Sequence, residues 1–82
     1  MTFKYRQSVL NELARHGVAP REDTPPELIR EFISDLYVHE IRALKAELKQ
    51  GRFPKSEYAG RVEQLRRRYP ILSLPVAHWT EE

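Results

Sequence analysis

Three ionisable residues at four-residue intervals form the best candidate for a chemical site in this sequence. Glu31, Asp35 and His39 are spaced i, i+4 and i+8, so a helix would place them along one edge. Two carboxylates and an imidazole in that arrangement can bind a divalent metal ion. No second histidine lies nearby, and charged residues at this spacing are common on a solvated helix edge. We therefore expect a polar edge and no metal site.

Nucleophilic catalysis and phosphate binding have less support in the residues. The sequence contains no cysteine and only three glycines, so it has neither a thiol nucleophile nor a glycine-rich loop. Its serines lie in no catalytic motif, and no small-molecule substrate or cofactor is indicated. The sequence therefore predicts a non-catalytic protein that needs no cofactor.

Glu40 is a carboxylate that falls within the apolar face of its predicted helix. Such a position is costly unless a positive charge or a hydrogen bond stabilises the carboxylate. Two interpretations are open: a structural ion pair with an arginine of a neighbouring helix, or a carboxylate that binds a partner or takes part in catalysis. We favour the ion pair, with Arg61 as the candidate partner.

An arginine-rich stretch raises the alternative of nucleic-acid binding. The residues concerned are Arg61, Arg66, Arg67 and Arg68. Three consecutive helical residues fan over about 200°, so they do not all face one phosphate track. Glu57 and Glu63 stand four positions before Arg61 and Arg67 and partly neutralise them, and the net charge is only +2. A nucleic-acid-associated protein is therefore the second choice.

The spacing of apolar residues predicts an all-α fold with three helices in one small domain. The expected helices span residues 2–16, 25–50 and 54–69, and residues 70–82 follow as an apolar tail. Gly17 and Gly51 stand where C-cap glycines belong, and Pro70 ends the third helix. Thr24 is expected to cap the second helix, with Pro25 at its first position and Glu27 completing a capping box.

The lengths of the elements predict how they pack. The second helix is about 39 Å long and the other two about 20 Å each, so neither short helix covers the long one. We expect the first helix to pack on the first half of the second helix, and the third to fold back on the second half as an antiparallel hairpin. The tail, which contains Pro75, is expected to be extended and to pack back on the helices.

This arrangement leaves an apolar surface that a partner would have to cover, so the sequence predicts an interaction or regulatory protein. We expect a homodimer or another helical partner. The candidate interface residues are Tyr37, Ile41, Leu44, Leu48, Tyr58, Leu72, Leu74 and Trp79. Whether the tail closes the core or docks on another protein is open at this point.

Residues 44–65 also resemble the helical hairpin of the short C-terminal domain (SHOCT) family. The matching residues are Leu44, Gly51, Phe53, Glu57, Tyr58, Arg61 and Leu65. The sequence departs from the family at Pro54, where a threonine cap is usual, in the spacing from Leu48 to Gly51, and in lying away from the terminus. The resemblance implies a module for oligomerisation or interaction.

The residues also predict a location. The first seven residues carry charges where a secretory signal needs an apolar run, and no stretch reaches the ~20 apolar residues of a membrane span. The lack of cysteine agrees with a reducing compartment. We therefore expect a cytoplasmic protein that does not enter a membrane.

Overall fold

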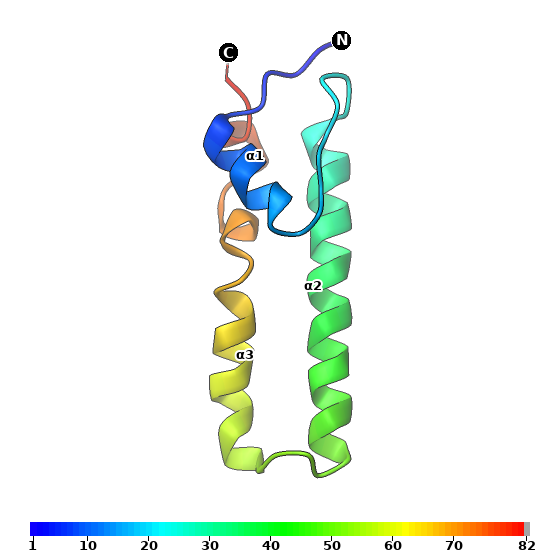
Figure 1. Cartoon of the computed structure of the whole chain (residues 1–82), viewed down its shortest axis with the longest axis vertical. Coiled ribbons are helices and arrows are strands. Elements are labelled where there is room, and N and C mark those ends of the chain that lie inside the picture. The colour runs from blue at the N-terminus through cyan, green and yellow to red at the C-terminus, as the bar shows by residue number, and fades with distance from the viewer. Residues whose placement is uncertain (82) are drawn as a thin grey trace.

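A computed structural model describes residues 1–81 and confirms the all-α fold with three helices. The helices are α1 (Gln7–Ala14), α2 (Pro26–Lys49) and α3 (Tyr58–Arg66). Three short 3-10 turns accompany them: η1 (Lys55–Glu57), η2 (Pro70–Ser73) and η3 (Val76–His78). Helices α2 and α3 form an antiparallel hairpin, and α1 and both termini lie at the end opposite its turn (Figure 1).

Helix α1 begins at Gln7 and not near residue 2, because the residues before it pair with the end of the chain. Tyr5 and Thr80 form an antiparallel bridge. The amide of Arg6 donates to the carbonyl of Trp79 at 2.9 Å, and the amide of Glu81 donates to the carbonyl of Lys4 at 2.8 Å. These bonds hold the backbone extended, so the helix starts five residues later than predicted.

Helix α2 starts at Pro26 without the capping box that the sequence predicted. Pro25 is the N-cap residue and has an extended ψ of 134°, because a residue before proline is disfavoured in the helical region. The Thr24 hydroxyl instead accepts a hydrogen bond from the Arg21 amide at 3.1 Å. Thr24 thus stabilises the loop before the helix, and the second proline shifts the start by one residue.

The tail is folded into η2 and η3 rather than fully extended, and it forms the middle layer of the molecule. Pro70 occupies the first turn of η2, and Pro75 precedes η3, because proline suits positions that need no amide donor. Helix α1 packs on η2, and both η2 and η3 pack on α2. The first helix was expected to pack on the first half of the second helix, but most of its packing is on the tail.

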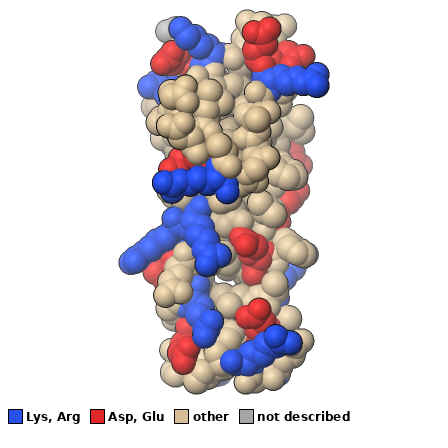
Figure 2. Space-filling view, in the orientation of Figure 1, with Lys and Arg blue, Asp and Glu red and all other residues tan. Residues whose placement is uncertain are grey.

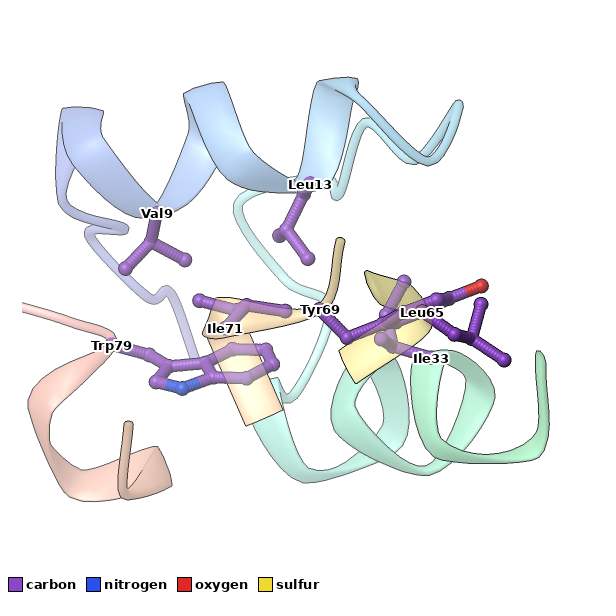
Figure 3. Close-up of a cluster of buried hydrophobic side chains, with 7 residues drawn as sticks. All are labelled: Val9, Leu13, Ile33, Leu65, Tyr69, Ile71 and Trp79. Atoms are coloured by element: carbon purple, nitrogen blue, oxygen red, sulfur yellow. The ribbon is translucent and has the colours of Figure 1, made fainter. Parts of the chain in front are cut away.

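The core lies where these layers meet. Seven side chains from all of them form one buried cluster: Val9, Leu13, Ile33, Leu65, Tyr69, Ile71 and Trp79. Figure 3 shows Ile71 and Trp79 between α1 and α2, with Val9 and Leu13 pointing toward them from α1. The Trp79 indole N–H donates to the Leu74 carbonyl at 3.0 Å, so the buried ring keeps its hydrogen bond.

The molecule is much longer than it is wide, measuring 49 × 17 × 16 Å. Its radius of gyration is 15.3 Å, whereas a compact domain of this length has about 12 Å. The excess length comes from the end of the hairpin near Gly51, where α2 and α3 extend beyond α1 and the tail (Figure 1). Gly51 has a positive φ of 72°, which allows the chain to reverse there.

Candidate interaction surface

The predicted interface residues divide into a core residue and a half-buried set. Trp79 is fully buried at 0% exposure, so it is part of the core and cannot anchor a partner while the chain is folded. The question left open for the tail is thereby answered, because the tail closes the core. The other predicted residues are half-buried: Tyr37, Ile41, Leu44, Leu48, Tyr58, Leu72 and Leu74.

Three of these half-buried residues lie where the hairpin consists of two helices alone. Leu44 and Leu48 come from α2, and Tyr58 comes from α3, whereas Ile41 packs against the core cluster. Two packed helices cover only one side of each other, so an apolar seam between them stays partly open to water. Nearby, Phe53 is buried beneath the Arg61 guanidinium, which lies 4.2 Å from the ring centroid. This cation–π contact closes the turn end of the seam.

A groove of about 240 Å³ runs along one side of this seam, between the two helices. We call it the hairpin groove, and its lining residues are Glu40, Ala43, Leu44, Glu47, Arg61, Gln64, Leu65 and Arg68. All the acidic members come from α2 and all the basic members from α3 or the residues just after it. Figure 2 shows a hollow in the lower half of the view, with Lys and Arg atoms and Asp and Glu atoms around it.

Glu40 is stabilised by a tyrosine and not by the predicted arginine. The Tyr69 hydroxyl donates a hydrogen bond to Glu40 Oε2. Arg61 instead pairs with Glu57, one turn earlier on its own side of the hairpin, at 3.2 Å. Within residues 1–81 the predicted ion pair between Glu40 and Arg61 is therefore not formed. The neutral hydroxyl of Tyr69 thus stabilises the carboxylate, for which the sequence analysis expected a positive charge.

Tyr69 is the functional-looking residue that sequence reasoning overlooked. Its ring stacks on His16 with 4.4 Å between centroids and meets Tyr37 edge-on at 5.1 Å. Burial raises the pKa of Tyr69 above its ordinary value, and Glu40 raises it further while Arg68 lowers it. The phenol thus keeps its proton, which is the opposite of what an activated base or nucleophile needs. Its helical spacing from Tyr58 and Leu65, eleven and four residues earlier, was the available signal for a core position.

No family model, curated protein or solved structure matches the chain. The resemblance to the short C-terminal domain family therefore stays a prediction.

Three of the arginines considered for nucleic-acid binding are engaged with acidic neighbours. Arg66 and Arg67 both pair with Glu63, each at 3.7 Å, and Arg61 pairs with Glu57. Arg68 differs from them, since it lines the hairpin groove. Two glutamates thus partly neutralise the three arginines, which weakens the case for a phosphate backbone as ligand.

The three candidate metal ligands lie along the polar edge of α2. Glu31, Asp35 and His39 are all exposed. Across residues 1–81 no cluster of three or more His, Asp or Glu side chains is placed to hold a metal ion. As for lipid, none of the described helices combines the length and the apolar character that crossing a bilayer requires.

A second apolar surface is exposed on α2. Leu28 and Phe32 lie one turn apart and are 58% and 55% exposed. Ile33 is instead the residue of this helix that is fully buried, because the tail occupies the inner face of α2. The two side chains form a small patch that is separate from the hairpin groove.

Proposed function

We propose that this chain is a non-catalytic interaction protein that associates with itself through the apolar faces of its helical hairpin. The observation that carries the proposal is an excess of surface. The chain exposes 6212 Å², whereas a compact monomer of 9.7 kDa exposes about 5,100 Å². About 1,100 Å² per chain is thus available beyond what a globular monomer of this mass presents.

That excess is comparable to what a stable protein interface requires. Standard interfaces bury roughly 600–1,000 Å² on each partner. At the end of the hairpin where two helices stand alone, Leu44 and Leu48 are only half-buried. A second helical hairpin laid on this face would complete a four-helix arrangement, in which such residues become core.

A regulatory or adaptor role and a cytoplasmic location belong to the same proposal. They are supported by the lack of cysteine and by the raised pKa of the Tyr69 phenol, which keeps this buried side chain protonated.

Sedimentation equilibrium of the purified chain, from low to high micromolar concentration, tests the proposal. We expect a mass that rises from one toward two chains with concentration, because a small half-open seam gives micromolar rather than tighter association. A single-chain mass at the highest concentration, in low salt as well as in physiological salt, would refute self-association.

A further inference from the structure

The charges of the hairpin groove specify which surface two chains share and how they are oriented. We infer that the groove is the site of a two-fold dimer in which the acidic side of one chain lies on the basic side of the other. This inference rests on the self-association proposed above and adds the residues and the symmetry of the contact.

The acidic and basic sides of the groove match in spacing. Glu40 and Glu47 lie seven residues apart on α2, and Arg61 and Arg68 lie seven residues apart on and just after α3. Seven helical residues correspond to two turns, or about 10 Å. Because the helices are antiparallel, Glu40 lies at the same level of the hairpin as Arg68, and Glu47 at the level of Arg61.

These charges are not fully satisfied within the chain. Glu40 receives one hydrogen bond, from Tyr69, and a carboxylate can accept several. Among the ion pairs recorded for residues 1–81, none contains Glu47 or Arg68. A second chain that brings opposite charges to Glu47 and Arg68 would therefore supply partners that the single chain lacks, and it would give Arg61 a second carboxylate besides Glu57.

The charge pattern selects one of two possible two-fold arrangements. With the axis parallel to the long axis of the hairpin, α2 of each chain lies over α3 of the other, with residues at equal levels facing. Glu40 then meets the other chain's Arg68, Glu47 meets its Arg61, and symmetry doubles both contacts. With the axis across the hairpin, α2 would lie on α2, and acidic residues would face acidic residues. Only the first arrangement gives attraction.

The groove also has room for a close approach. Ala43 lies on the α2 side of the groove between the two acidic residues, and its side chain is small and exposed. Ala43, Leu44 and Leu65 are the apolar members of the lining, and Leu65 is already buried in the core. Covering the exposed Ala43 and the half-buried Leu44 gives the contact an apolar centre with charges at its rim, which is the usual composition of a protein interface.

Charge exchange between two variants tests both the surface and the orientation. Glu47→Arg and Arg61→Glu are each made in the full chain. In either homodimer the exchanged residue meets a like charge twice, so we expect dimer affinity to fall about 30-fold or more. When the two variants are mixed, each contact again joins opposite charges, and we expect a heterodimer of nearly wild-type affinity, measured by sedimentation or native mass spectrometry.

Matched controls separate the contact from the change in charge. Lys45→Glu is an exposed change of the same size on α2, outside the groove lining, and should leave the dimer intact. Ala43→Trp should block the groove, whereas Ala46→Trp, an exposed residue outside the lining, should not. Circular dichroism of every variant shows whether it is folded, which matters most for Arg61→Glu because Arg61 also covers Phe53.

Each result decides a separate point. If the wild-type chain is dimeric but the single variants dimerise equally well, the groove is the wrong surface, and the proposal of self-association survives. If the single variants dissociate and their mixture does not recover, the orientation inferred here is wrong. If the wild-type chain remains a monomer under all conditions, both this inference and the proposed function fail.

Discussion

Replacing Trp79 by alanine should remove a large part of the stability of this chain. The indole is fully buried at 0% exposure and donates a hydrogen bond to the Leu74 carbonyl at 3.0 Å. A buried aromatic side chain removes roughly 150–250 Å² from water, worth about 4–6 kcal/mol at 25 cal/mol per Å². Measured Trp→Ala changes in cores cost about 3–5 kcal/mol. We therefore expect a loss of about 4 kcal/mol.

That loss is a large part of the chain's total free energy of unfolding. A domain of 82 residues has a free energy of unfolding of about 4–12 kcal/mol. With a urea dependence of about 1 kcal/mol per molar, the midpoint of unfolding should fall by about 4 M. The assay is urea unfolding followed by circular dichroism, because the variant has lost the only tryptophan of the sequence.

Two companion variants define the comparison. Trp79→Phe keeps much of the ring but loses the N–H donor, so we expect an intermediate loss of about 1–2 kcal/mol. Phe32→Ala removes an aromatic ring that is 55% exposed and should cost under about 1 kcal/mol. A Trp79→Ala variant as stable as Phe32→Ala would show that the tail does not close the core.

Three further predictions follow from single contacts. The free energy of unfolding should fall as the pH rises above 10.0, the ordinary pKa of tyrosine. The pKa of Tyr69 is raised in the folded chain, so the unfolded chain loses this proton first. Thermal melts from neutral to alkaline pH measure the decline, which should be shallower in Tyr69→Phe. Gly51→Ala should lower the free energy of unfolding by about 1 kcal/mol, because Gly51 has a φ of 72°. Gly60 lies within α3 with open space around it, so Gly60→Ala should instead raise the free energy of unfolding by about 0.5–1 kcal/mol. Equal effects of the two variants in urea unfolding would contradict this. Arg30→Met should cost about 1 kcal/mol by removing the hydrogen bond to the Leu72 carbonyl at 3.0 Å, and an unchanged urea midpoint would count against that contact.

Local patterns in the sequence were sufficient to predict the helices of the hairpin. Helix α2 occupies residues 26–49, and the predicted range was 25–50. The agreement is close because the segment between the prolines and Gly51 contains no further proline or glycine, so few other helix boundaries are possible. The predicted third helix was too long at both ends, since Lys55–Glu57 form a 3-10 turn and α3 ends at Arg66. The α-helical part therefore covers the centre of the predicted segment.

Contacts between distant segments could not be predicted in the same way. The early residues were assigned to a helix because Tyr5 fits helical spacing, but its pairing with Thr80 depends on residues more than seventy positions away. The partner of Glu40 was missed for a similar reason, since a tyrosine was considered only as an apolar residue. The hydroxyl of Tyr69 is what places it beside a carboxylate.

The position of the tail between α1 and α2 constrains the order in which the chain assembles. The α2–α3 hairpin joins segments close in sequence and can form early, but α1 has no completed surface to dock on until η2 and η3 are in place. The first and last segments must therefore fold together in a late step, and they should unfold together when the chain opens. Amide hydrogen exchange would then report one common opening rate for Arg6 and Glu81, although they lie at opposite ends of the chain.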